Sequence, residues 1–174
     1  MFLRHLRPAR LLAALLLPGL TILAGCGMSQ RHHDPDQLEC MERAMYFESI
    51  RSSRDGMVAV GSVVMNRVAS PEFPGTVCGV VGQKGQFAPE IMTREMGGSS
   101  MMAVREAATS VLAGERHPLI GNAQFFHAAS YRASYNNMHY VLTSGGNAFY
   151  EKRRPEFVTR PSPPGALEGI TGRG

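Results

Sequence analysis

One carboxyl group stands where the sequence predicts an apolar side chain. On a helix over residues 38–50, Glu48 shares its face with Met41, Ala44 and Met45, because positions three, four and seven apart project from the same side. A carboxyl among apolar side chains is hard to ionise, and the negative end of its own helix acts in the same direction. Both effects raise its pKa toward the range in which a general acid works. Glu48 is therefore our candidate proton donor.

The charged residues on the opposite side of this helix follow the ordinary solvated pattern: Glu39, Glu42 and Arg43. An alternative for Glu48 is a frayed helix end, where its carboxylate is exposed or paired with Arg51 or Arg54. The sequence alone leaves both interpretations open.

Histidines supply the other group of residues with catalytic chemistry. His117, His127 or His139 could bind zinc together with a carboxylate. The 12 positions from His127 to His139 match no helix-based ligand pair, so we expect no metal and no cofactor.

The first residues of the 174-residue chain have the layout of an export signal. Three arginines precede an apolar run of 13 residues, 11–23, which is shorter than the roughly 20 that a membrane-spanning helix needs. The run ends in Leu-Ala-Gly-Cys26, which resembles the lipobox of bacterial lipoproteins. We expect residues 1–25 to be a lipoprotein signal peptide, Cys26 to carry the lipid, and residues 26–36 to be a tether. A plain signal peptide cut at a nearby small residue is the alternative.

The lipid would anchor the protein to a membrane, and Gly27 after the cysteine favours the outer membrane, facing the periplasm. Removal of residues 1–25 takes three of 18 basic residues and none of 14 acidic ones, which leaves 15 against 14. This balance argues against a nucleic-acid partner. The 149 residues that remain are enough for a core without a partner, so we expect a monomer.

Two cysteines remain in an exported chain, Cys40 and Cys78. We expect them to form a disulfide, since the compartment is oxidising. The bond would join the helix that carries Glu48 to the loop around Pro74.

Helical patterns continue beyond the first helix. The Ser52–Asp55 capping box starts a helix that should end near Ala69, before Pro71. Residues 71–98 are broken by glycine and proline, and within them 83–88 fit a short hairpin or a substrate-lining loop. A further helix is expected from Ser99 or Ser100 to Ala113.

The last third of the chain changes to strand patterns. Residues 140–142 and 148–150 read as two short strands around a glycine turn. Residues 156–174 are rich in proline and glycine, and we expect a disordered tail. The elements together predict an α+β domain, mainly α, over residues 37–155.

Six collinear stretches resemble the SleB-like cell-wall hydrolases: Ala44–Glu48, Gly56–Val68, Phe73–Val81, Gly85–Phe87, Phe126–Ala128 and Gly146–Tyr150. The resemblance implies a lysozyme-like domain with a small β portion that acts on the glycan strands of peptidoglycan. It places the family's catalytic glutamate on Glu48. It also implies a substrate-binding role for the side chains that would shape the glycan groove: Asn66, Arg67, Gln86, Phe87, His127 and Tyr135. Phe87 is equally consistent with the core.

The expected reaction is cleavage of the MurNAc-GlcNAc glycosidic bond by a lytic transglycosylase, in which one glutamate is acid and then base. Hydrolysing glycosidases usually add a second carboxylate, and Asp55, Glu90 and Glu95 are candidates by position only. One alternative is a zinc-dependent N-acetylmuramoyl-L-alanine amidase. Another is a non-catalytic peptidoglycan-binding lipoprotein, since the family's second glutamate is Ser52 here.

Overall fold

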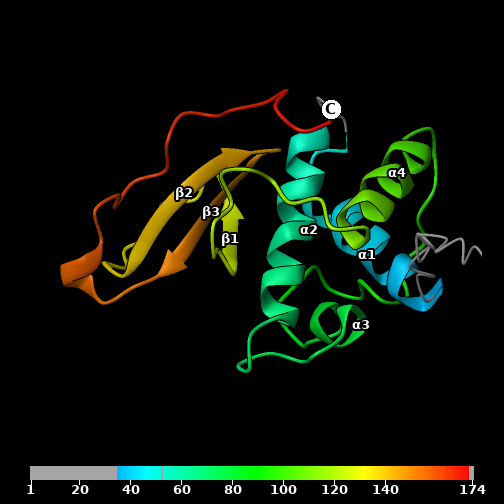
Figure 1. Cartoon of the computed structure of the whole chain (residues 1–174), viewed down its shortest axis with the longest axis horizontal. Coiled ribbons are helices and arrows are strands. Elements are labelled where there is room, and N and C mark those ends of the chain that lie inside the picture. Colours follow the sequence, from blue (N-terminus) through cyan, green and yellow to red (C-terminus); the bar gives the residue numbers. More distant parts are fainter. Residues whose placement is uncertain (1–34, 52, 173–174) are drawn as a thin grey trace, which may run out of the picture. The chain divides into compact units, whose positions relative to one another are not determined.

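Four α-helices precede a three-stranded sheet in the computed structural model, which describes residues 35–51 and 53–172 (Figure 1). The elements are α1 Pro35–Glu48, α2 Arg54–Val68, α3 Val77–Val81, α4 Met101–Leu112, β1 Phe125–Ala128, β2 Met138–Ser144, β3 Asn147–Lys152 and the 3-10 helix η1 Pro155–Phe157. This confirms the predicted mainly helical α+β fold. The predicted signal peptide and Cys26 lie outside the described residues. No helix in the described ranges is long and apolar enough to cross a bilayer.

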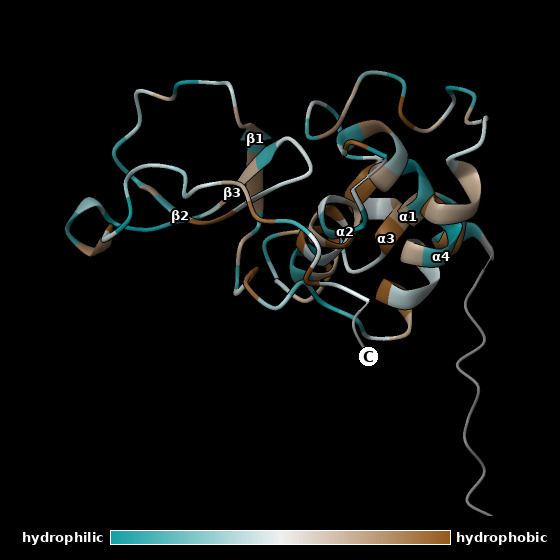
Figure 2. Cartoon of the chain, turned by 90° about the horizontal axis from the view of Figure 1, so that it is seen from above, coloured by the Kyte–Doolittle hydropathy of each residue, from teal (hydrophilic) through white to brown (hydrophobic). Residues whose placement is uncertain are grey.

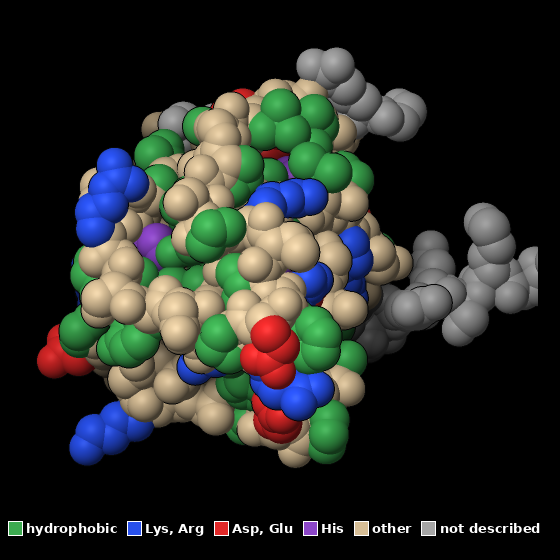
Figure 3. Space-filling model, turned by 90° about the vertical axis from the view of Figure 1, so that its left-hand side faces the viewer, with side chains coloured by type: hydrophobic (Ala, Val, Ile, Leu, Met, Phe, Trp, Pro, Cys, Tyr) green, Lys and Arg blue, Asp and Glu red, His purple; other side chains and the backbone are tan. Residues whose placement is uncertain are grey.

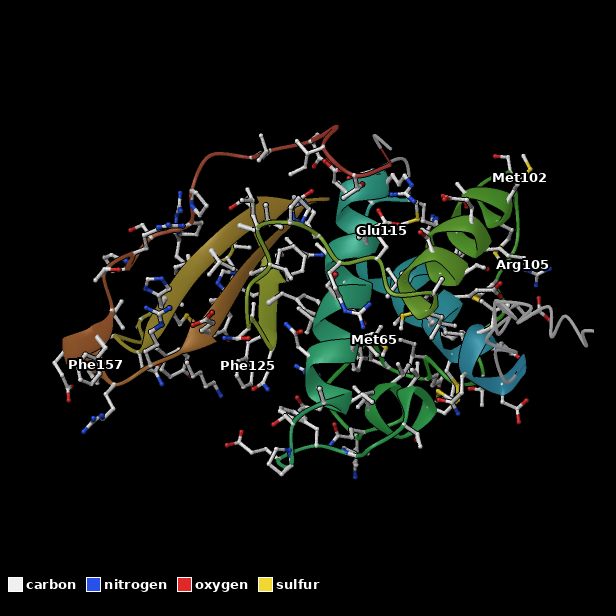
Figure 4. All side chains as sticks on the ribbon, in the orientation of Figure 1. Met65, Met102, Arg105, Glu115, Phe125 and Phe157 are labelled. Atoms are coloured by element: carbon white, nitrogen blue, oxygen red, sulfur yellow. A yellow bond between two sulfur atoms is a disulfide. The ribbon has the colours of Figure 1, made fainter. Side chains whose placement is uncertain are left out.

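Helix α1 is buried along the stripe that its sequence predicts. Met41, Ala44 and Met45 are completely buried. Glu42, expected in solvent, is wrongly predicted: it is 2 % exposed and forms an ion pair of 2.7 Å with Arg105. Arg105 extends from α4, as labelled in Figure 4. The reason is that α1 packs against α2, α3 and α4, so its buried face is wider than one stripe. The helix also begins at Pro35, so it includes residues 35 and 36, which were expected to be the end of the tether.

Helix α2 packs against the other three helices and against β2, and its residues 55–64 are buried. Its N-cap is Ser53 rather than Ser52 of the predicted box, because the Ser53 hydroxyl accepts the hydrogen bond of 2.9 Å from the Gly56 N–H. The helix ends at Val68, as expected from Pro71. Brown apolar segments of the helices face one another in Figure 2, where this core forms.

Helix α3 was not predicted, because its five residues are too few for a helical period to show. The Thr76 hydroxyl caps it by accepting from the Gly79 N–H at 3.1 Å. The predicted disulfide between Cys40 and Cys78 is confirmed, with Cα atoms 5.2 Å apart, and it joins α3 to α1. The segment 83–88 forms turns and not a hairpin.

The sheet has the order β1-β3-β2 and is antiparallel throughout. Both predicted strands are confirmed and are longer than expected. Phe126, Leu142 and Phe149 join the helical core, whereas Tyr140 and Tyr150 belong to a second, smaller cluster. The sheet therefore packs a layer of apolar side chains on each face.

The C-terminal segment corrects the expectation of disorder. Residues 160–172 return along β2 toward the first turn of α2, seen as the red trace in Figure 1. Leu167 N–H donates to the Thr143 carbonyl at 2.9 Å, and Ile170 N–H donates to the Asp55 carboxylate at 2.8 Å. A composition rich in proline and glycine predicts disorder because it does not reveal partners elsewhere in the fold. Here buried Asp55 is such a partner, since its carboxylate binds the backbone of the segment.

Candidate active site

Glu48 is the last residue of α1, and its side chain is half-buried. Its Oε1 accepts a 2.5 Å hydrogen bond from the Ala88 backbone N–H, which comes from the loop after α3. Among the residues that the structure describes, neither Arg51 nor Arg54 forms the ion pair with Glu48 that the alternative predicted. Arg51 donates to the Tyr46 carbonyl, and Arg54 pairs with two other carboxylates.

Burial is the largest influence on Glu48, and it raises the pKa of the carboxyl above its ordinary value of 4.5. The Ala88 N–H and the positive charges of Arg67 and Arg94 act in the opposite direction, but they do not cancel it. The carboxyl thus retains its proton to a higher pH than a solvated glutamate, as a general acid requires.

The backbone around Glu48 is fixed by the turn between β2 and β3. The Asn147 side-chain amide donates a 2.5 Å hydrogen bond to the Glu48 carbonyl, and Ile50 N–H donates to the Gly145 carbonyl at 3.2 Å. A Cβ on Gly145 would lie 2.4 Å from the Cα of Gly56, so the turn touches the start of α2. These contacts prevent the fraying that the sequence left open.

Arg67 brings a buried positive charge to the same region. It is 3 % exposed, its Nε donates to the Gln124 carbonyl at 2.7 Å, and its Nη1 has no hydrogen-bond partner among the described residues. The guanidinium lies over the rings of Phe73, Phe87 and Phe125, with centroid distances from 5.1 to 5.7 Å. This places Arg67 under the surface, where it acts on Glu48 through its charge.

Burial lowers the pKa of Arg67 to about 10, against the opposing influence of Tyr150 and Glu48. The guanidinium still carries its proton at neutral pH. It is therefore a fixed positive charge that favours the Glu48 carboxylate when that carboxyl loses its own proton.

Two other predicted groove residues have structural partners. The Asn66 side-chain amide donates to the carbonyls of Gly121 and Ala123 at 3.0 and 2.9 Å, and so holds the segment before β1. Phe87 is 9 % exposed and packs against Phe126 at 6.3 Å between ring centroids, so it belongs to the core.

The remaining predicted groove residues lie nearer the surface. Gln86 is exposed, two positions before the N–H that binds Glu48. His127 Nε2 is 2.7 Å from the Tyr140 hydroxyl. Tyr135 is 67 % exposed and lies in the loop before β2. Their contacts with glycan stay predictions.

None of the predicted second carboxylates joins Glu48. Asp55 is bound by the C-terminal segment, and Glu90 and Glu95 are exposed. Within residues 35–51 and 53–172, no group of three or more His, Cys, Asp or Glu side chains is placed to hold a metal. His117 accepts the backbone N–H of Leu119, two positions along the chain, and His139 accepts that of Thr159.

Sequence reasoning missed two partners of Glu48. Ala88 contributes only a backbone N–H, which leaves no signature in the residue type. Asn147 falls within a motif that resembles the family, but that motif predicts no partner 99 positions away.

The surface at the end of the sheet carries mixed charge. Figure 3 shows basic side chains spread among acidic and apolar ones.

Comparison with known proteins agrees with the family resemblance of the sequence. The sequence model described as Cell Wall Hydrolase matches residues 51–150, a segment that begins three positions after Glu48. Two spore cortex-lytic enzymes of Bacillus cereus are 34% identical over 76 residues, which are 44% of this chain. The match spans only 27% of the length of these curated relatives.

Two solved structures share the fold. The catalytic domain of the germination-specific lytic transglycosylase SleB from Bacillus anthracis has a TM-score of 0.57 at 24% identity, covering 70% of this chain and 98% of that domain. The catalytic domain of the Bacillus cereus SleB protein has a TM-score of 0.54 at 26% identity, covering 70% and 94%. The predicted lysozyme-like architecture is thus confirmed as the fold of these catalytic domains.

Proposed function

This chain belongs to the Cell Wall Hydrolase family, and we propose that it cuts the MurNAc-GlcNAc bond of peptidoglycan as a lytic transglycosylase. The observation that carries the proposal is the half-buried carboxyl of Glu48, with its raised pKa and a partner that fixes its direction. The likeness to a domain described as a lytic transglycosylase supports the same reaction.

In the proposed reaction Glu48 first gives its proton to the glycosidic oxygen, and the bond from that oxygen to C1 of the muramic residue breaks. The resulting carboxylate then takes the proton of the muramic 6-hydroxyl, whose oxygen bonds to C1. The products are a free GlcNAc hydroxyl and a 1,6-anhydro end, without consumption of water. One carboxylate performs both steps, so no second carboxylate is needed.

Two fixed groups would stabilise Glu48 between these steps. The Ala88 N–H already donates to Oε1, and Arg67 supplies a buried positive charge. Both favour the carboxylate that forms when the proton leaves. Arg67 does not have to move during the reaction, because its bond to the Gln124 carbonyl and its contact with the Phe87 ring hold it in place.

The products from purified sacculi test the proposal. We expect anhydro-muropeptides by mass spectrometry, and a loss of roughly 100- to 10,000-fold with Glu48→Gln. Glu39→Gln on the same helix is the matched control, because Glu39 is exposed and pairs with the neighbouring Arg43. Reducing sugar ends would indicate hydrolysis, and released stem peptides an amidase. Sacculus binding without any release would favour a binding protein, which the serine at position 52 keeps as the second candidate.

We also infer that the mature protein is a monomeric lipoprotein of the outer membrane, attached through Cys26 and facing the periplasm. The support is the lipobox-like Leu-Ala-Gly-Cys26 and the following Gly27. Mass analysis of the N-terminal peptide should show a diacylglyceryl group, and Cys26→Ala should release the protein from membranes. An unmodified N-terminus at another residue would contradict this.

A further inference from the structure

The C-terminal segment lies outside the part of the chain that the family match covers. That match ends at residue 150, whereas residues 160–172 run back along β2 to the start of α2 (Figure 1). The Tyr140 N–H donates to the Arg160 carbonyl at 3.0 Å, and the Leu167 N–H donates to the Thr143 carbonyl at 2.9 Å. The segment is thus joined to β2 at two points, and we call residues 160–172 the strap.

Two carboxylates hold the end of the strap. Asp55 is 2 % exposed and accepts the N–H groups of Ile170 and Thr171, each at 2.8 Å, and also the Thr171 hydroxyl. Glu168 is on the strap itself. Its Oε1 accepts the Gly145 N–H at 2.7 Å, and its Oε2 accepts the Ser53 hydroxyl at 2.5 Å.

The groups that Glu168 binds are those that fix the backbone next to Glu48. The carbonyl of Gly145 accepts the Ile50 N–H, and the N–H of the same glycine donates to Glu168. Ser53 is the N-cap of α2, and its own N–H donates to the Ile50 carbonyl at 2.8 Å. Glu168 therefore connects both partners of Ile50, two positions after Glu48.

We propose that Glu168 is a positioning residue for Glu48: it ties the turn between β2 and β3 to the N-cap of α2 and so fixes the end of α1. The proposal rests on the proposed function of Glu48. Glu168 touches neither Glu48 nor any reacting group, and acts through Gly145, Ser53 and Ile50. A shift of about 1 Å at a catalytic group is enough to lower a rate by up to about 100-fold.

The test compares Glu168→Ala and Glu168→Gln with Glu156→Gln. Glu156 is a matched control, because it lies in η1 at the far end of the sheet and pairs with the exposed Arg154. We expect Glu168→Ala to lower kcat on sacculi about tenfold with little change in KM, since the orientation of Glu48 and not glycan binding is disturbed. Glu168→Gln keeps an acceptor for the Gly145 N–H and should recover most of the rate.

Hydrogen exchange at the Ile50 amide gives a readout that does not depend on activity. We expect faster exchange at Ile50 in Glu168→Ala, with no change in Glu156→Gln. Unchanged exchange, or a wild-type kcat in Glu168→Ala, would overturn the positioning role. A fall in kcat that merely follows the unfolded fraction, measured by urea titration, would also overturn it. If exchange rises while the wild type itself releases no anhydro ends, the proposed reaction fails and the positioning stands.

Discussion

The backbone N–H of Ala88 points at Oε1 of Glu48 from a loop 40 positions away, at 2.5 Å. This single bond fixes the direction of the carboxyl and favours its ionised form, whereas burial favours its protonated form. The two opposing influences suit a group that must give a proton and then take one back. They also make the stability of the fold depend on the charge of Glu48.

Glu48→Gln should raise the melting temperature near pH 7. The folded pKa of Glu48 lies above 4.5, so folding favours the protonated carboxyl, and this contribution is lost as pH rises through the folded pKa. Glutamine is neutral at every pH and keeps an oxygen for the Ala88 N–H. Thermal unfolding at about pH 4 and about pH 7 should show a gain for the variant only at the higher value, with Glu39→Gln unchanged. A variant less stable than wild type near pH 7 would contradict the burial argument.

The charge of Arg67 should set the alkaline limb of the activity profile. Activity needs protonated Glu48, so the rate falls as pH rises through its pKa. Arg67 lowers that pKa, and Arg67→Gln removes its charge, so the limb should move to higher pH. Arg67→Lys keeps the charge and serves as the control for the lost contact with Gln124. If kcat falls at the same alkaline pH in both variants, the charge of Arg67 does not lower the pKa of Glu48.

The disulfide between Cys40 and Cys78 should contribute a large part of the stability. It closes a loop of 38 positions, and the chain-entropy model gives about 4 kcal/mol for such a loop. The double substitution to serine should lower the free energy of unfolding in urea by this order. Wild-type protein with reductant is the matched comparison, and reductant should leave the double variant unchanged. A double variant as stable as the oxidised protein would show that α3 needs no covalent link to α1.

Buried His117 should make the fold less stable in weak acid. Burial lowers its pKa below 6.5, although Asp55, Glu168 and Glu115 oppose this, so the unfolded chain binds more protons in that window. Stability is then lost as pH falls below about 6.5. His117→Asn keeps an acceptor for the Leu119 N–H but does not titrate, and it should flatten this dependence in urea titrations from about pH 5 to 7.5.

His139 also contributes to the dependence of stability on pH. Burial lowers its pKa as well, so some dependence on pH should remain in the His117→Asn variant. A slope identical to wild type would assign the whole effect to other groups.

The sequence by itself determined the positions of the long elements, the disulfide and the unusual place of Glu48. Helices such as α2 repeat their apolar residues over several turns, and the two strands are short apolar runs on either side of a glycine turn, so local patterns suffice. A carboxyl on an apolar face is likewise visible in one short stretch. Glu42 shows the limit of that method, because α4 covers a side of α1 that its own pattern leaves polar.

Only the tertiary structure decided which groups act on Glu48 and what the last residues do. Ala88 and Asn147 lie 40 and 99 positions from Glu48 in the sequence, and Asp55 binds Ile170 of the strap, which lies 115 positions away. Such bonds join a backbone N–H or carbonyl to a side chain, and every residue except proline offers the same backbone donor. No residue type marks them in advance. They exist because packing of the helices and the sheet brings distant segments within hydrogen-bonding distance.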